Sequence, residues 1–84
     1  MADLNQLRHE IDAINQQLEK LLIQRFNLVT EAGNLKQAAQ LPVCDPKREA
    51  EILAQVGQAD TSLKEPLQQV FKTIMAQSRA LEQQ

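Results

Sequence analysis

The chain has 84 residues, of which 43% are apolar, and its net charge is −2. A chain of this length is expected to form one small domain, residues 1–84, that buries only about 60% of its unfolded surface. The slightly negative charge and the absence of Trp and Tyr argue against a nucleic-acid surface, which needs basic residues and stacking aromatics.

One long helix is predicted from Asp3 to about Gln40. This segment contains no proline, and its apolar residues recur with the helical period. At about 1.5 Å per residue, the helix is more than about 50 Å long. Gly33 costs up to about 1 kcal/mol relative to alanine inside a helix, so we interpret it as the mark of a close helix contact.

Two shorter helices are expected after Pro42, because proline cannot continue a helix. Asp45 is a good N-cap and Pro46 suits the first position of the second helix, which ends near Gly57. A capping box at Ser62–Glu65 predicts the start of the third helix. The apolar side of that helix carries Leu63, Leu67, Val70, Phe71, Ile74, Met75 and Leu81. The predicted fold class is therefore all-α.

The apolar stripe of the long helix is too extensive for two short helices to cover. At spacings of three, four and seven it carries Leu7, Ile11, Ile14, Leu18, Leu21, Leu28, Val29, Ala32 and Ala39. In one compact chain, part of this stripe would remain in water, and long helices of this kind usually complete their core with a second chain. We therefore expect an intertwined homodimer in which the long helices pair.

Arg25 and Lys36 lie eleven residues apart on this same apolar stripe. At about 100° per residue, the two positions differ by only about 20° around the helix. Because an unpaired buried cation is costly, two cations there indicate a buried anion that both hold. Ser78 and Glu82 likewise fall on or beside the apolar stripe of the third helix.

Further charged residues lie near the start of each of the first two helices. Arg48 and Glu49 occupy the first turn of the second helix, just after Asp45. Arg8 is about 25 Å from Arg25 along the helix axis, too far to share a ligand within one helix. In an antiparallel dimer, Arg8 of one chain would approach the Arg25 region of the other.

Together these segments resemble the all-helical, or type II, chorismate mutases. The resemblance rests on residues 7–12, 21–25, 31–36, 42–49 and 74–78, which read LRHEID, LLIQR, EAGNLK, PVCDPKRE and IMAQS. It covers nearly the whole chain in order. It implies an intertwined dimer with two equivalent sites, each built from both chains, that convert chorismate to prephenate on the route to phenylalanine and tyrosine.

The reaction implied by the resemblance is a Claisen rearrangement, which needs no nucleophile, metal or cofactor. The substrate is a small dicarboxylate that must be held in a compact, reactive conformer. As the C–O bond breaks, negative charge builds on the ether oxygen, where fixed donors stabilise the transition state.

The resemblance also implies a role for each site residue. Arg25 and the partner chain's Arg8 would hold the carboxylates, since a guanidinium fork binds a carboxylate bidentately. Lys36 would reach the ether oxygen and a carboxylate oxygen. The remaining contacts, to the carboxylates, the wall and the ring hydroxyl, would come from Arg48, Ser78, Glu49 and the backbone near Asp45.

Glu82 departs from the family pattern, because many members carry Gln at this place beside the ether oxygen. An amide donates a hydrogen bond to a developing oxyanion, whereas an ionised carboxylate repels it. Only protonated Glu82 would help, so we expect activity to rise toward mildly acidic pH. Lys36, Glu82 and Arg25 are the predicted catalytic residues.

Two other functions fit the same residues. An isochorismate pyruvate-lyase on this scaffold would use a similar cationic pocket, although Glu49 and Ser78 match the mutase pattern better. A non-catalytic helical dimer, acting as an adaptor or regulatory module, would instead pair Arg25 and Lys36 with acids such as Glu31, and would bind no small dianion.

Location and regulation are also open to prediction. Cys44 is the only cysteine, which excludes an internal disulfide and a multi-cysteine metal site. The N-terminus is polar and no apolar run approaches about 18 residues, so we expect a cytoplasmic protein without membrane contact. We expect no fused dehydratase, dehydrogenase or regulatory domain in a chain of this length, in which case feedback control would require a partner enzyme of the same pathway.

Overall fold

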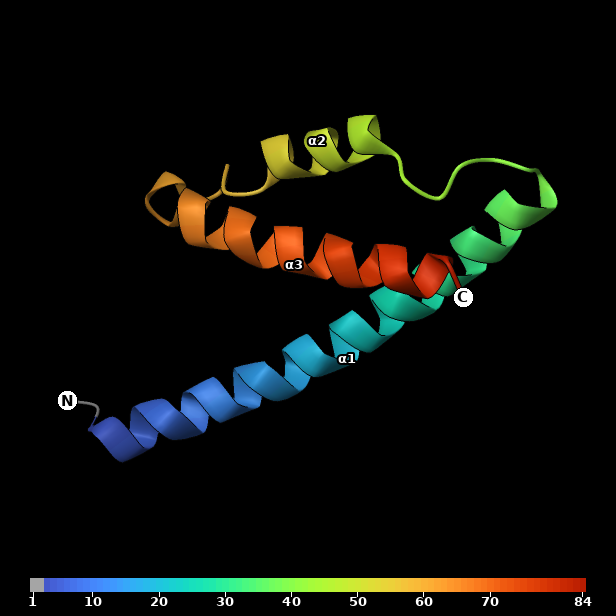
Figure 1. Ribbon diagram of the computed structural model, residues 1–84. Coiled ribbons are helices and arrows are strands. Elements are labelled where there is room, and N and C mark those ends of the chain that lie inside the picture. The colour runs from blue at the N-terminus through green and yellow to red at the C-terminus, as the bar shows by residue number, and fades with distance from the viewer. Residues whose placement is uncertain (1–2) are drawn as a thin grey trace.

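The computed structural model describes residues 3–84. In this range the chain forms α1 (Leu4–Ala38), α2 (Pro46–Gln55), a 3-10 turn η1 (Thr61–Leu63) and α3 (Lys64–Glu82), and no strand. α3 lies between the other two helices, packed against α2 and against the C-terminal half of α1 (Figure 1). The all-α class and the order of one long and two shorter helices are confirmed.

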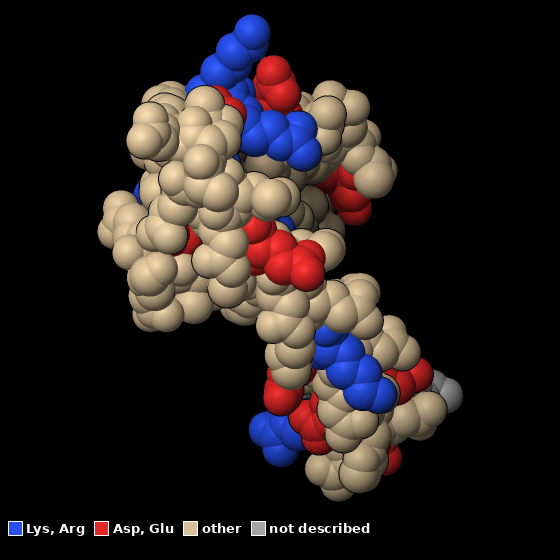
Figure 2. All heavy atoms as spheres, turned by 90° about the vertical axis from the view of Figure 1, so that its right-hand side faces the viewer, with Lys and Arg blue, Asp and Glu red and all other residues tan. Residues whose placement is uncertain are grey.

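The molecule is elongated, 56 × 24 × 15 Å, with a radius of gyration of 16.1 Å. A compact chain of this length would have a radius of gyration of about 12 Å. The N-terminal half of α1 accounts for the difference, because it projects from the other helices as a bare rod (Figure 1; Figure 2). Within the described range, no helix is both long and apolar enough to cross a membrane.

The two ends of α1 have different capping motifs. At the start, the Asp3 side chain accepts a hydrogen bond from the Gln6 N–H at 2.8 Å. At the end, the Gln40 N–H donates to the Gln37 carbonyl and the Leu41 N–H donates to the Lys36 carbonyl, at 3.1 and 2.8 Å. These two bonds form a Schellman motif, which requires a left-handed residue after the helix. Gln40, with φ of 58°, takes that conformation.

The predicted start of α2 is confirmed, and the predicted cap of α3 is wrong. Asp45 caps α2 by accepting from the Arg48 N–H at 3.1 Å. Ser62 instead donates to Asp60, which caps η1, and α3 begins without a side-chain cap. Leu63 occupies the N-cap position, and its apolar side chain cannot accept a hydrogen bond. Pro66, at N3, has no N–H that could be donated to a capping side chain.

Gly33 marks a close helix contact, as the sequence predicted. It is buried, and a Cβ atom placed on it would lie 2.9 Å from the Cα of Glu82. Any side chain at this position would push the end of α3 away from α1. The glycine therefore sets the distance between Glu82 and the adjoining turn of α1.

We predict that Gln40→Gly stabilises the fold by about 0.5–1 kcal/mol, because glycine takes the left-handed conformation without the Cβ clash that glutamine has there. The matched control is Gln37→Gly, which places the same change inside α1 and should destabilise it by about 1 kcal/mol. Urea unfolding at one fixed protein concentration measures both. A loss of stability in Gln40→Gly would contradict the strain assigned to this position.

Candidate functional site

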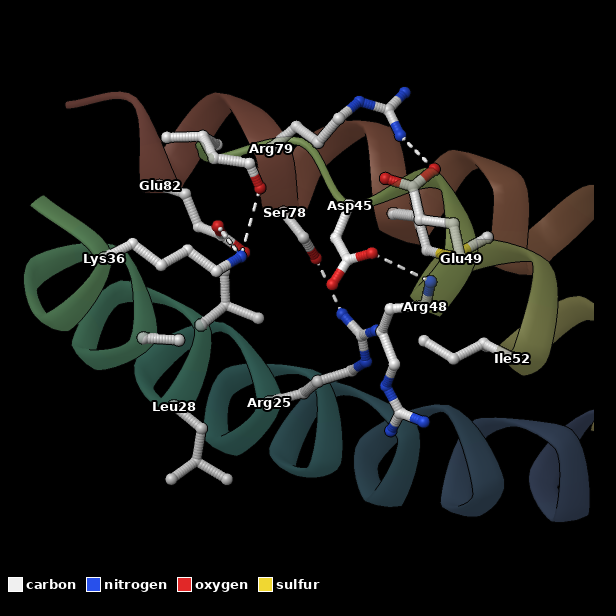
Figure 3. Close-up of a pocket in the computed structure, with 14 residues that line it drawn as sticks. Arg25, Leu28, Lys36, Asp45, Arg48, Glu49, Ile52, Ser78, Arg79 and Glu82 are labelled. Atoms are coloured by element: carbon white, nitrogen blue, oxygen red, sulfur yellow. Dashed lines mark hydrogen bonds and ion pairs between the residues drawn. The ribbon is translucent and has the colours of Figure 1, made fainter. Parts of the chain in front are cut away.

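A cavity of about 330 Å³ lies between α1, α3 and the segment that runs from Val43 into α2 (Figure 3). This volume is within the range of small-molecule sites. The apolar walls come from Leu28, Val29, Ala32, Val43, Ile52 and Met75. The polar lining comes from Arg25, Lys36, Asp45, Arg48, Glu49, Ser78, Arg79 and Glu82. All of the predicted site residues except Arg8 therefore meet at one cavity.

Lys36 reaches across the cavity from α1 to the last residue of α3. Its Nζ donates to Glu82 Oε2 at 2.7 Å and to the Val43 carbonyl at 3.1 Å. The two side chains are only 26% and 11% exposed, so this ion pair is largely shielded from water. It joins α1, the loop before α2 and the end of α3.

Arg25 is held by a neutral partner. Its Nη1 donates to Ser78 Oγ at 2.6 Å, and the Ser78 hydroxyl in turn donates to the Ile74 carbonyl at 2.8 Å. Ser78 is buried, with 6% exposure, and Arg25 is half-buried. Because the Ser78 proton is used within its own helix, its oxygen is left to orient the guanidinium.

Arg25 has no acidic partner among residues 3–84. The ion pairs in that range are Lys36–Glu82, Arg79–Glu49 and Arg48–Glu51. Glu31 takes part in none of them; of the two cations that an adaptor would pair with acids, Lys36 is paired, with Glu82, and Arg25 is not. The cavity lining holds four cations and three acids, a local charge of +1 in a chain of net charge −2. The unpaired guanidinium is therefore placed to receive an anion.

Asp45 and Arg48 lie at the start of α2. Asp45 uses Oδ1 to cap the helix, at 3.1 Å from the Arg48 N–H. The Arg48 side chain is 61% exposed and lies 3.5 Å from Glu51, a contact that contributes little in water. Its guanidinium is thus free to turn toward a ligand.

Arg8 lies apart from these residues. It is exposed on the projecting half of α1 and does not line the cavity. Seventeen residues separate it from Arg25, which is about 25 Å along the axis. The expectation that one chain does not bring Arg8 to the site therefore agrees with the geometry.

Arg79 was missed by the sequence reasoning. Its Nη1 donates to Glu49 Oε1 at 2.5 Å and so joins α3 to α2. The hydrogen bond that Arg79 donates to Glu49 and the negative charge of that carboxylate raise the pKa of Arg79 above its ordinary value. The only signal in the sequence is that Arg79 follows Ser78, about 100° around the helix from the apolar stripe.

No group of three or more His, Cys, Asp or Glu side chains in residues 3–84 is placed to hold a metal ion. The donors that the cavity offers are guanidinium and ammonium N–H groups together with one hydroxyl. This donor set suits carboxylate or phosphate oxygens, which accept charge-assisted hydrogen bonds.

Comparison with known proteins gives a family match and partial relatives. The sequence matches the family model described as chorismate mutase type II over residues 7–83. It is 35% identical over 81 residues to a T-protein of Enterobacter agglomerans, covering 93% of this chain and 22% of that protein. It is 31% identical over 88 residues to a bifunctional chorismate mutase/prephenate dehydratase of Aquifex aeolicus, covering 98% of this chain and 24% of that protein.

The chain spans less than a quarter of the length of these curated relatives. No solved structure matches it at comparable significance. The family match extends over all three helices and includes every residue that lines the cavity. The chain belongs to the type II chorismate mutase family.

Proposed function

We propose that this protein catalyses the Claisen rearrangement of chorismate to prephenate. Family membership supports this activity, as does the printed name of the Aquifex aeolicus relative, which includes chorismate mutase. The observation that carries the proposal is Arg25, a half-buried cation at the cavity that has no acidic partner among residues 3–84. A small dicarboxylate would supply the missing negative charge.

Arg25 would bind one carboxylate of the substrate. Ser78 engages only Nη1 of the guanidinium, so N–H groups remain for an incoming carboxylate. Because the fork is already oriented, less conformational freedom is lost when the substrate binds. Arg48, at the exposed edge of the cavity, would turn inward to hold the same dianion.

Lys36 would stabilise the charge that develops on the ether oxygen. A lysine ammonium has three N–H donors, and two of them are used by Glu82 and the Val43 carbonyl. The third is available to the substrate. A donor that is fixed before the reaction and aimed at the developing charge lowers the barrier without reorganisation.

Glu49 would accept the hydrogen bond of the ring hydroxyl, together with the backbone near Asp45. The Glu49 side chain is 26% exposed and lines the cavity at the first turn of α2. No atom of the described chain donates to its second oxygen, Oε2. That oxygen is the proposed acceptor for the substrate.

We also propose that the active form is a homodimer whose second copy covers the stripe of α1. Large apolar side chains on that stripe are 45–64% exposed over about 30 Å, namely Leu7, Ile11, Ile14, Leu18, Leu21 and Leu28. Within the described range only Gly33, Gly57, Met75 and Ser78 are buried, which is a small core for a stable fold. In an antiparallel pair, the partner's Arg8 would complete the site.

The cytoplasm is the proposed location. We also retain the prediction that feedback control would require a partner enzyme of the same pathway. The alternative lyase activity would release pyruvate from isochorismate, so product analysis separates it from the mutase. The adaptor alternative predicts no turnover.

We predict that the purified protein consumes chorismate and forms prephenate, followed by the loss of chorismate absorbance with identification of the product. Lys36→Ala should lower kcat by at least about 100-fold, because it removes a donor to the developing oxyanion, while circular dichroism still shows a helical fold. Lys72→Ala, which removes an exposed cation of α3 away from the cavity, is the matched control and should retain activity. If a folded dimer showed no turnover, the proposed enzymatic activity would be refuted and the adaptor alternative would be favoured.

The charge of Glu82 can be tested by a neutral substitution. The ionised carboxylate would repel the oxyanion that develops on the ether oxygen, whereas an amide would donate a hydrogen bond to it. Glu82→Gln should therefore have a higher kcat than the wild type at neutral pH. Glu65→Gln removes the same charge from an exposed acid in the first turn of α3 and should keep the wild-type rate. A Glu82→Gln variant that is no faster than the wild type would count against this role.

Mixing two inactive variants tests the shared site. Arg8→Ala and Arg25→Ala should each be nearly inactive alone, and their mixed dimers should regain up to about a quarter of wild-type activity, because half of randomly formed dimers are mixed and each carries one intact site. Each variant refolded alone is the control. If mixing restores nothing although sedimentation shows dimers that exchange chains, Arg8 does not act across the interface.

A further inference from the structure

The ion pair between Arg79 and Glu49 lies beside the reaction site without pointing into it. Arg79 Nη1 donates to Glu49 Oε1 at 2.5 Å, and the two side chains are 36% and 26% exposed. Figure 3 shows the Arg79 guanidinium beyond Glu49, on the side away from Arg25. Arg79 thus holds Glu49 from behind and leaves Oε2 without a donor in the described chain.

We propose that Arg79 is a positioning residue, which holds the Glu49 carboxylate in the orientation that accepts the ring hydroxyl of the substrate. This inference rests on the proposed chorismate mutase function. Arg79 would not touch the substrate itself. It would act through one oxygen of Glu49 and leave the other oxygen for the ligand.

The first reason is conformational. A free glutamate side chain loses much rotamer freedom when it is fixed, and a catalytic contact made by a mobile group is weaker than one made by a group already in place. Glu49 has no other hydrogen-bond donor within residues 3–84. Arg79 is therefore the residue that fixes it before the substrate arrives.

The second reason is electrostatic. The proposed substrate is a dianion, and Glu49 would bring another negative charge to the same cavity. Without Arg79 this carboxylate would repel the substrate, since the other cations of the cavity are engaged elsewhere or needed for the substrate carboxylates. The guanidinium offsets this charge while the carboxylate remains an acceptor.

The ion pair is not the only side-chain bond between α3 and α2 in residues 3–84. A second bond already links α3 to α2, because Gln68 Nε2 donates to the Leu53 carbonyl at 3.0 Å. Gln68 does not line the cavity. It therefore offers a matched structural control, a contact between the same two helices that does not involve Glu49.

A double-mutant cycle tests the inference. Arg79→Met should lower kcat/KM for chorismate by roughly fivefold, the upper effect of a partly exposed ion pair. In a Glu49→Gln background, the same Arg79→Met change should have no further effect, because the group that it positions is already altered. Gln68→Met should lower the melting temperature but leave kcat/KM unchanged. Arg79→Lys, which retains the charge but not the planar fork, should recover part of the loss.

The outcomes separate this inference from the proposed function. If the wild type does not turn over chorismate, both are overturned. If the wild type is active and Arg79→Met equals it, or loses the same factor with and without Glu49→Gln, only the positioning role is overturned. Should Arg79→Met fail to fold, the cycle is measured with Arg79→Lys, for which equal losses in the two backgrounds have the same meaning.

Discussion

The close approach of α3 to α1 at Gly33 is the constraint on which the rest of the site depends. A Cβ on Gly33 would lie within 2.9 Å of the Glu82 backbone, so glycine alone permits this distance. The approach puts Glu82 beside Lys36, while Ser78, one turn earlier, meets Arg25. The two α1 residues, Arg25 and Lys36, are eleven positions apart, whereas their partners on α3 are four positions apart. The crossing of the helices allows both pairs to form. In the Schellman motif that ends α1, the Lys36 carbonyl accepts a hydrogen bond from the Leu41 N–H. The turn that ends the helix therefore also fixes the backbone of Lys36.

The charges of the cavity fall into two groups. Lys36 and Arg79 are each balanced by an acid, Glu82 or Glu49, and these pairs join different elements of the fold. Arg25 is balanced only by a hydroxyl. A half-buried cation without a counter-ion is costly, and a bound dianion would relieve that cost. The proposed affinity for a dicarboxylate thus comes from local charge, in a chain whose net charge is negative.

The projecting half of α1 is the surface on which the proposed dimer depends. Its apolar stripe is continuous with the cavity, because Leu28 belongs to both. A partner chain laid along this stripe would bury exposed apolar side chains and bring a further arginine toward the open side of the site. In the proposed dimer, stability and catalysis would therefore depend on the same surface. That dependence would explain why so little of one chain is buried by itself.

The local sequence determined the helices, the N-cap at Asp45, the glycine contact and the stripe that carries Arg25 and Lys36, because period, caps and proline act within a few residues. It also carried the family resemblance, and with it every cavity residue proposed as a ligand. The cap before α3 was wrongly predicted at Ser62, because the backbone N–H and the hydroxyl of Ser62 both donate to Asp60. The pairing of Lys36 with Glu82, and of Arg79 with Glu49, was decided only by the tertiary structure. Helical periodicity tells which side of a helix is apolar, but the residue that lies opposite depends on how the helices cross and how closely they approach.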